Sequence, residues 1–348
     1  MSGGLAPAWP DPGEAGRLAA WLRAETGWPR GPLEVSRLAA GGSNELYELE
    51  ADGSRLVLRR PPRTPSAPGA HDVVRETRVL RALDATDLPH PRLVAVCPDD
   101  KVAGAPFYVM SRVEGFTARA PLPALFGEKA ALRELAEAAL DALVRIAALD
   151  WRELGLGGFG RPEGFLARQT GRWLGQLERY RTRQLPHLEA IAGWLDANLP
   201  DAGPESLLHG DYQLVNLMFA TQRPARVAAV LDWEMSTVGD ARADLGWLLA
   251  GWEEQGEPSC RPYPQITGLA GMPRRRELAE RYAEATGTPI EDLAWFEVLA
   301  LFKLSCIMEG SYFRRLRGES DNELHDALEW SIPVMLERAA AFAGGELV

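Results

Sequence analysis

The order of apolar and polar positions changes character once along the chain, close to residues 113–117. Upstream, short apolar runs with strand spacing predict strands at 46–49, 56–59, 93–97 and 107–113. Downstream, apolar positions recur every three or four residues and predict helices at 128–149, 162–185, 187–198, 241–254, 274–287, 290–316 and 322–342. We therefore expect an α+β protein of two lobes, with a small antiparallel sheet in 1–113 and a mostly helical lobe in 114–348.

The first lobe carries local signals for helix starts and turns. Asp11 as N-cap, Pro12 at the first helical position and Glu14 as capping-box partner predict a leading helix from residue 11 to about residue 27. The Asp52-Gly53 step between two apolar runs predicts a β-hairpin. A main helix is predicted over 71–83. These signals describe a sheet with one main helix, preceded by the leading helix.

A polar loop of the second lobe carries the candidate chemistry. The stretch HGDYQLVN begins at His209 and ends at Asn216, and Asp232 follows in the stretch VLDWE. Short apolar runs that predict strands flank these positions, at 206–208, 217–219 and 227–231. We therefore expect Asp211, Asn216 and Asp232 to lie at adjacent strand ends.

These three side chains match the needs of phosphoryl transfer. The reaction needs a carboxylate that orients the accepting hydroxyl, and oxygen ligands that hold Mg²⁺ against the phosphates. Asp211 can supply the first, and Asn216 and Asp232 can supply the second. An isolated HGD turn with a satisfied histidine is the alternative explanation. An aspartate at position 232, within an apolar run, is costly to bury without a partner, and this favours the phosphotransferase site.

The first lobe offers candidate contacts to a nucleotide. Gly42, Ser43 and Asn44 form a turn of small residues whose backbone N–H groups suit a phosphate, although such turns are common. A kinase-type lobe pairs a cation on the third strand with a carboxylate on the next helix, and Arg59 or Arg60 with Glu76 fits that arrangement. Strand alternation places Arg59 with Val57, and Arg60 on the opposite face. A surface salt bridge is the alternative for this pair.

Composition limits the class of protein. With 348 residues the chain is longer than one hydrophobic core usually organises. A net charge of −11 argues against nucleic-acid binding. Three scattered cysteines suggest neither disulfides nor a zinc site. No apolar stretch is long enough to cross a bilayer, and the first residues do not resemble a signal peptide, so we expect a soluble cytoplasmic protein without membrane partners.

The motifs together resemble a known family. HGDYQLVN with LDWE resembles the aminoglycoside phosphotransferase (choline kinase-like) family, whose fold is similar to that of protein kinases. The resemblance extends through GGSNELYEL, LVLRRPP, HDVVRETRVLRAL, APFYVMSRVEG and GDARADLGWLL, and so covers nearly the whole chain. GGSN, VLRRPP and PRRRELAERY look most like the subgroup that is also found joined to acyl-CoA dehydrogenases.

The resemblance implies a role for particular residues. It makes Asp211 the catalytic base and Asn216 and Asp232 the magnesium ligands. Arg59 falls where the family places its phosphate-contacting cation, often a lysine, and Glu76 where it places that cation's partner.

The resemblance also implies roles for residues around this site. Met110, Arg112 and Val113 lie in the segment implied to read the nucleotide base. His209 is implied to brace the loop and Asp244 to anchor it.

The acceptor remains open at this point. The chain has HGD where protein kinases have HRD, and it lacks their APE-type activation segment. We therefore expect an ATP- or GTP-dependent O-phosphotransferase whose acceptor is a small hydroxylated molecule and not a protein. The acidic stretches 253–257 and 319–323 would suit an aminoglycoside or amino alcohol. The arginine clusters at 274–276 and 314–317 would suit the phosphates of a hydroxyacyl-CoA. Solvated helix faces are the simpler explanation of each run. A catalytically inactive nucleotide-binding or scaffolding protein is the alternative function, and the oligomeric state is not predicted.

Overall fold

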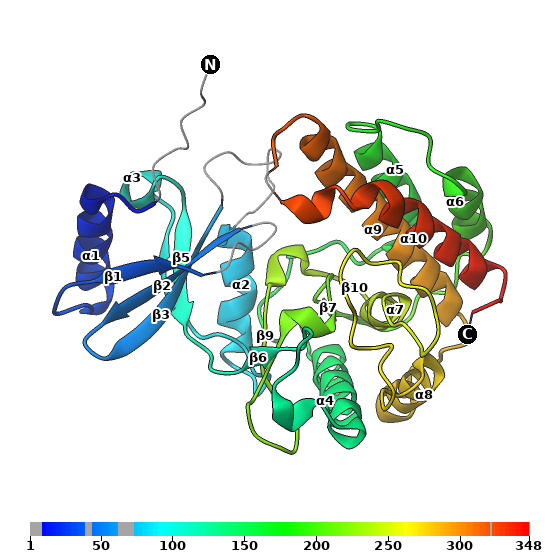
Figure 1. Ribbon diagram of the computed structural model, residues 1–348, viewed down its shortest axis with the longest axis horizontal. Coiled ribbons are helices and arrows are strands. Elements are labelled where there is room, and N and C mark those ends of the chain that lie inside the picture. Colours follow the sequence, from blue (N-terminus) through cyan, green and yellow to red (C-terminus); the bar gives the residue numbers. More distant parts are fainter. Residues whose placement is uncertain (1–8, 39–43, 62–72, 321, 348) are drawn as a thin grey trace. The chain divides into compact units, whose positions relative to one another are not determined.

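The computed structural model describes residues 9–38, 44–61, 73–320 and 322–347. The chain divides into two compact units, 1–113 and 114–348. Figure 1 shows the strands of the first unit in blue and cyan and the helices of the second from green to red. Each unit has its own hydrophobic core and is described separately below.

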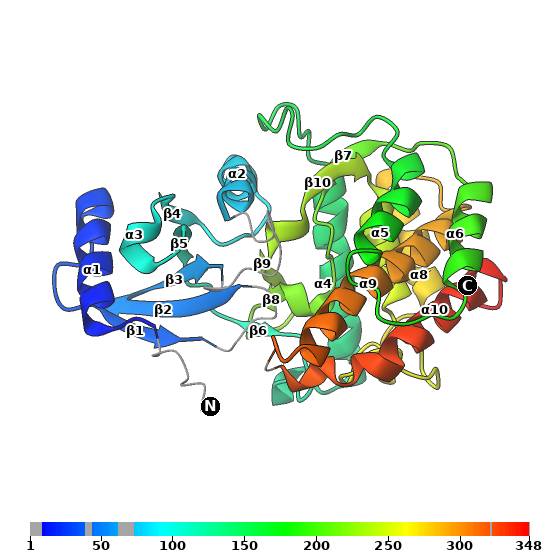
Figure 2. The same ribbon diagram turned by 90° about the horizontal axis from the view of Figure 1, so that it is seen from above.

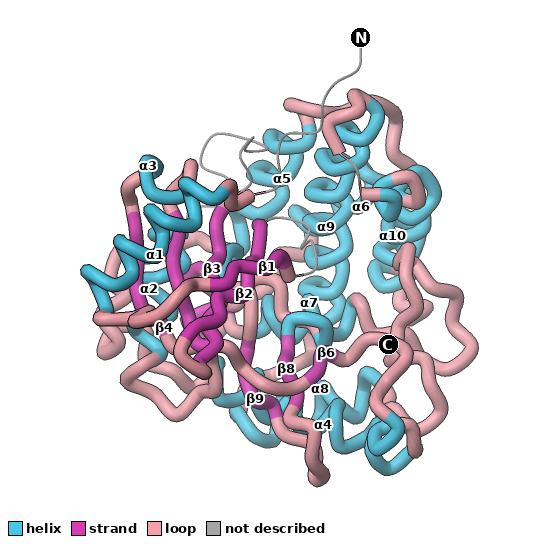
Figure 3. The backbone as a smooth tube through the Cα atoms, turned by 60° about the vertical axis from the view of Figure 1, so that its left-hand side comes forward, coloured by secondary structure: helices cyan, strands magenta, loops and turns pink. Residues whose placement is uncertain are grey.

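The first unit is built on a five-stranded antiparallel sheet, drawn in magenta in Figure 3. Its order is β1 (Glu34–Arg37), β2 (Glu45–Ala51), β3 (Ser54–Arg60), β5 (Phe107–Ser111) and β4 (Leu93–Cys97). Asp52 and Gly53 join β2 to β3 with φ values of 53° and 72°. Positive φ at both turn residues is the geometry that Asp-Gly favours in a two-residue hairpin, so the predicted hairpin is confirmed.

Helices cover both faces of this sheet (Figure 2). α1 (Pro12–Thr26) begins with the predicted capping box between Asp11 and Glu14, and it packs with the short α3 (Asp100–Ala103) on one face. Leu58 lies in the core on that face. α2 (Val73–Leu83) covers the other face, where Arg59 meets it. The predicted start of α2 at residues 71 and 72 lies outside the described residues.

The described part of the second unit contains two small β-sheets. β6 (Phe116–Thr117), β8 (Leu217–Phe219) and β9 (Val227–Val230) form one sheet, and β7 (Glu205–Leu208) pairs with β10 (Thr237–Asp240). The sequence analysis predicted β7, β8 and β9 but missed β6 and β10. β10 has only four residues and includes a glycine, so its apolar alternation is too short to recognise.

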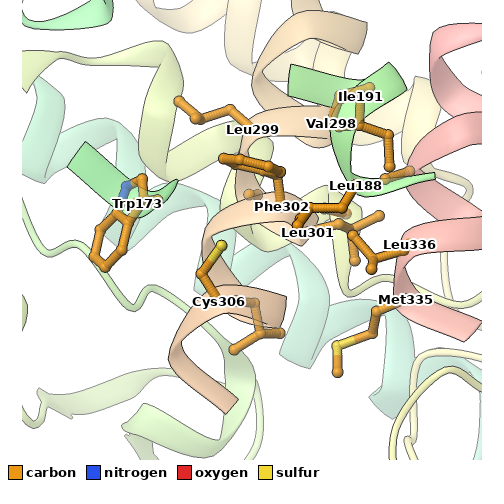
Figure 4. Packing of buried hydrophobic residues seen from close by; sticks show 14 of the residues in the cluster. Trp173, Leu188, Ile191, Val298, Leu299, Leu301, Phe302, Cys306, Met335 and Leu336 are labelled. Carbon is orange, nitrogen blue, oxygen red and sulfur yellow. The ribbon is translucent and has the colours of Figure 1, made fainter. Parts of the chain in front are cut away.

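Helices form most of the second unit. They are α4 (Lys129–Ala147), α5 (Gln169–Leu177), α6 (Leu188–Ala197), α7 (Arg242–Ala250), α8 (Arg275–Thr286), α9 (Leu293–Leu316) and α10 (Leu328–Ala343). α9 is central and packs against α5, α6, α7 and α10. Figure 4 shows side chains of α9 such as Phe302 among residues from α5, α6 and α10. In the described part of the chain, no helix is both long and apolar enough to span a membrane.

The prediction of one helix over 162–185 is wrong. The helix proper covers only α5, because turns enclose it on both sides. Before it, the Phe165 N–H bonds to the Pro162 carbonyl and Gly164 has a φ of 62°. After it, the Tyr180 N–H bonds to the Leu177 carbonyl and closes the last turn. The apolar spacing continued through these turns, so periodicity alone overestimated the length of the helix.

Candidate active site

The loop after β7 has a backbone conformation that requires glycine at position 210. Gly210 has a φ of 82°, and a Cβ placed there would lie 2.3 Å from the Met235 carbonyl oxygen. A side chain would therefore meet both backbone strain and a hard steric clash. The loop passes close to the segment after β9, which brings two distant parts of the sequence together.

Asp244 of α7 anchors this loop from within the core. Its Oδ2 accepts the His209 N–H at 2.6 Å and its Oδ1 accepts the Gly210 N–H at 2.9 Å. The carboxyl is buried, and burial raises its pKa, while the hydrogen bonds from the two N–H donors oppose the rise. The anchoring position implied for Asp244 by the sequence motif is therefore the one that the structure has.

His209 joins the loop to the end of β9. Its buried ring places Nε2 2.8 Å from the Leu231 carbonyl oxygen, and Nδ1 accepts the Asp211 N–H at 3.2 Å. Since Nδ1 accepts, the proton lies on Nε2, and the neutral ring satisfies both bonds. Both ring nitrogens are thus engaged with backbone, as expected for a residue that braces the loop.

The Asp211 carboxylate is oriented by three side chains. Oδ1 accepts from Gln213 Nε2 at 2.7 Å and from Trp247 Nε1 at 2.9 Å. Oδ2 accepts from Asn216 Nδ2 at 2.8 Å. Burial raises the pKa of the Asp211 carboxyl, and the nearby Asp232 carboxylate adds to the rise. The carboxylate therefore has a fixed direction and a second negative charge beside it.

Asn216 and Asp232 lie at the same end of the β8–β9 hairpin. Leu217 pairs with Val230, and the Leu231 N–H bonds to the Asn216 carbonyl oxygen at 2.8 Å. Asp232 has a φ of 65°, an uncommon left-handed conformation for a residue with a side chain, and such strain often marks a functional position. The structure thus brings Asp211, Asn216 and Asp232 together. Asn216 and Asp232 flank the β8–β9 hairpin, whereas Asp211 follows β7 in the other sheet.

The donor set suits a magnesium ion. Asn216 uses its amide nitrogen towards Asp211, which leaves its side-chain oxygen available to a metal ion. Mg²⁺ prefers such hard oxygen donors and commonly takes one or two from protein, with phosphates and water as the rest. Two carboxylates held close together also favour a divalent cation, because it would offset their repulsion.

Lys303 of α9 is a member of the site that the sequence analysis missed. Its Nζ donates to the Gly210 carbonyl oxygen at 2.6 Å and lies 4.1 Å from the centre of the Trp247 ring. The sequence does contain one indication of this role, since Lys303 is a lone lysine within an apolar helical stretch. A charge in such a position needs a specific partner.

The first unit contains the predicted pair of Arg59 and Glu76. Arg59 Nε lies 3.1 Å from Glu76 Oε2, and both side chains are almost fully buried. Arg60 points to the opposite face, where it pairs with Glu45 at 2.7 Å. Arg59 is therefore the arginine that meets the helix, and burial argues against a simple surface salt bridge.

The remaining predicted nucleotide contacts have different positions. Asn44 is buried just before β2, whereas Gly42 and Ser43 lie outside the described residues. Met110 is part of β5. Arg112 Nε pairs with Glu48 at 2.7 Å, and Arg112 Nη1 donates to the Val113 carbonyl oxygen at 2.9 Å. The Arg112 side chain thus stabilises the segment after β5.

The charged stretches considered for substrate binding form ion pairs with one another and with nearby residues. Glu257 accepts from Arg275 at 2.7 Å and from Arg338 at 3.0 Å. Burial would raise the pKa of Glu257, but these arginines hold it at about 2. Arg315 pairs with Asp326 at 2.6 Å. These pairs make the stretches stabilising elements, so their charges do not select between a cationic and an anionic acceptor.

Sequence comparison identifies relatives of the chain. Residues 34–278 match the phosphotransferase enzyme family. Acyl-CoA dehydrogenase family member 11 of Gallus gallus is 35% identical over 303 residues, which are 85% of this chain and 38% of that protein. Acyl-CoA dehydrogenase family member 10 of Mus musculus is 32% identical, over 84% of this chain and 27% of that protein. The chain therefore spans well under half the length of these relatives.

Solved structures show the same fold. A putative aminoglycoside phosphotransferase from Ralstonia eutropha is 29% identical, with a TM-score of 0.79 over 95% of this chain and 98% of that one. The aminoglycoside phosphotransferase APH(4)-Ia, solved with ADP and hygromycin B, has a TM-score of 0.59 at 15% identity, over 94% of this chain and 97% of that one. The α+β, kinase-like fold is thus confirmed. The chain belongs to the phosphotransferase enzyme family.

Proposed function

We propose that this chain transfers the γ-phosphoryl group of ATP or GTP to a hydroxyl of a small molecule, with the help of Mg²⁺. The observation that carries the proposal is the setting of Asp211. Among the described residues, its Oδ1 receives two hydrogen bonds and its Oδ2 receives one. A carboxylate oxygen accepts about two hydrogen bonds, so Oδ2 keeps one acceptor position for a substrate hydroxyl.

The neighbouring residues define what Asp211 does in this reaction. Oδ2 accepts the hydroxyl hydrogen bond, orients the nucleophilic oxygen and takes up its proton as the new bond to the γ-phosphorus forms. The bond between the γ-phosphorus and the nucleoside diphosphate oxygen breaks in the same step, and ADP or GDP leaves. Trp247 and Gln213 keep the carboxylate from rotating away. Asn216 and Asp232 would hold Mg²⁺, and a bound Mg²⁺ would offset the negative charge of the nucleotide phosphates.

We assign nucleotide contacts to the first unit, 1–113, and the catalytic and acceptor residues to the second, 114–348. Support comes from the buried Arg59–Glu76 pair, whose cation is held by a carboxylate as a phosphate-binding cation must be. The other residues proposed to contact the nucleotide are Gly42, Ser43, Asn44, Met110, Arg112 and Val113.

A hydroxylated acyl compound, such as a hydroxyacyl-CoA, is the first acceptor class that we propose. Support comes from the relatives, which are named as acyl-CoA dehydrogenases and resemble this chain over 84–85% of its length. An aminoglycoside or amino alcohol is the second class, and it is supported by the hygromycin B bound in the structure of a more distant aminoglycoside phosphotransferase.

A mass-spectrometric screen tests this proposal. The chain is incubated with Mg²⁺ and ATP or GTP, together with hydroxyacyl-CoAs, amino alcohols or aminoglycosides, and products are searched for an added phosphate. We expect a phosphorylated product from one class with wild type and none with Asp211→Asn. A nucleotide-binding or scaffolding protein would instead bind ADP and yield no product from any class.

A further inference from the structure

Lys303 occupies an unusual position on the central helix α9. All but three of the 38 basic residues of the chain are arginine, and this lysine is the one that contacts the loop carrying Asp211. Its Nζ donates to the Gly210 carbonyl oxygen at 2.6 Å. The same ammonium lies 4.1 Å from the ring centre of Trp247 and 5.6 Å from that of Trp173. It therefore sits between two indoles with one strong acceptor, a setting that suits a compact cation.

The contacts of Lys303 lead directly to the proposed base. The Trp247 ring that faces the ammonium also donates its Nε1–H to Asp211 Oδ1 at 2.9 Å. On the other side of the same loop, Asp244 holds the Gly210 N–H. Gly210 is thus fixed through its N–H by a buried carboxylate and through its carbonyl by an ammonium. Both anchors come from helices of the core, α7 and α9.

The charges around Lys303 come from three elements. Burial lowers the pKa of its ammonium to about 8. Asp211 of the loop and Asp244 of α7 favour the charged form, whereas Arg172 of α5 opposes it. The ammonium is therefore mostly charged at neutral pH and loses its proton in mildly alkaline solution.

We propose that Lys303 is a positioning residue for the phosphoryl transfer proposed above, since it holds the Gly210 carbonyl and, through the Trp247 indole, the direction of the Asp211 carboxylate. This inference rests on the proposed function. It predicts that loss of the ammonium reduces turnover more than nucleotide binding, because Lys303 acts on the carboxylate that orients the acceptor. A lysine that only stabilised the fold would change the melting temperature and leave the turnover of folded protein unchanged.

Steady-state kinetics with Mg²⁺ and ATP test the role in turnover. The variants are Lys303→Met, Lys303→Arg and the control Lys129→Met, whose lysine is exposed at the start of α4. Hydrolysis of ATP by water is the reaction measured, since it needs no identified acceptor. We expect Lys303→Met to lower kcat by about 10- to 100-fold with KM for ATP within about threefold, as a displaced catalytic group does. The control should match wild type.

The pH profile separates positioning from packing. Wild-type kcat should fall as the pH rises through about 8, where the ammonium loses its proton. In Lys303→Arg any residual kcat should lack this fall, because a guanidinium does not titrate there. Equal kcat for Lys303→Met and wild type, or the same fall with pH in Lys303→Arg, would overturn the inference.

A spectroscopic experiment tests the coupling without any turnover. Protein labelled with ¹³C at the lysine ε carbon should show three signals, one for each lysine. One signal should titrate near pH 8 and should be absent from Lys303→Met. Its pKa should fall further in Asp211→Asn, because that substitution removes a favourable charge. An unchanged pKa in Asp211→Asn would refute the coupling, whereas wild type without Mg²⁺-dependent turnover but with the expected shift would refute only the proposed function.

Discussion

At the scale of single residues, Arg59 and Glu76 form an ion pair in which both side chains are almost completely removed from water. Arg59→Met removes the cation and leaves a buried carboxylate, which typically costs about 3–5 kcal/mol. We expect urea denaturation of Arg59→Met to show a loss of this size, and the double variant Arg59→Met/Glu76→Leu to recover part of it. Arg37→Met is the control, because its pair with Glu45 is longer, at 3.7 Å, and Arg37 is exposed. Additive losses in the double variant would contradict the assignment.

Glu297 of α9 provides a pH-dependent prediction. Burial raises the pKa of this carboxyl to about 8, against a usual 4.5, and Arg275 and Arg338 only partly oppose the rise. The unfolded chain gives up the proton near pH 4.5 and the folded chain keeps it to about pH 8, so the group lowers stability as the pH rises through this window. Glu297→Gln should therefore raise the free energy of unfolding at pH 8 by on the order of 3 kcal/mol and change it little at pH 4.

Thermal denaturation at the two pH values measures this difference. The control is Glu291→Gln, because Glu291 is exposed near the start of the same helix and should give little change at either pH. A Glu297→Gln variant that is destabilised at pH 8 would show that the folded protein uses an ionised carboxylate at this position.

The residues that could be found from sequence share one property. Asp211, Asn216 and Asp232 lie within short motifs whose spacing the chemistry dictates, so their types and order were informative. Lys303 comes from a helix that follows almost a hundred residues later, and its contact with Gly210 depends on tertiary packing. No local pattern encodes such a contact, although an isolated lysine in an apolar helix was a usable hint.

Among the elements, the packing of α7 against α9 depends on a glycine. A Cβ at Gly246 would lie 2.4 Å from the Phe296 Cβ and 2.7 Å from the Phe296 carbonyl carbon. Gly246→Ala should therefore push the two helices apart and cost about 1–3 kcal/mol. Gly193→Ala in α6 is the matched control, since nothing lies within 4 Å of its added methyl group. That variant should instead gain about 0.5–1 kcal/mol, because alanine favours a helix interior.

Chemical denaturation followed by circular dichroism compares the two alanine variants. Because Asp244 and Trp247 flank Gly246 on α7, the Gly246→Ala variant should also lose catalytic turnover in its folded fraction. Equal stability of the two variants would mean that α7 and α9 can move apart without cost.

Element boundaries were predictable where a local signal ends the element. The capping box of α1 and the Asp-Gly turn between β2 and β3 are signals of this kind. β10 lacks one, since its identity comes from pairing with β7 across a long stretch of sequence. The length of α5 was overestimated because the turn at Gly164 interrupts a pattern that still appears periodic.

At the scale of the whole molecule, the two units contain different groups of candidate functional residues. The first contains a buried ion pair, and the second contains the loop anchors together with the residues that we propose as the base and the magnesium ligands. The relatives are more than twice as long as their match to this chain. Their names therefore do not identify the phosphate acceptor of this chain, which the screen described above is designed to find. The family and fold follow from motifs spread over both units, which is why sequence alone was sufficient for them.

We propose above that Asp211 is the base of a magnesium-dependent phosphoryl transfer. Its most direct test follows the γ-phosphate of ATP by ³¹P NMR with the acceptor from the screen, for wild type and Asp211→Asn, with calorimetry of ADP binding on the same samples. We predict that Asp211→Asn lowers the rate by about 10²- to 10⁴-fold and changes ADP affinity less than about threefold, and that EDTA stops the wild-type reaction. Equal transfer rates for the two proteins, or transfer that persists in EDTA, would contradict the account.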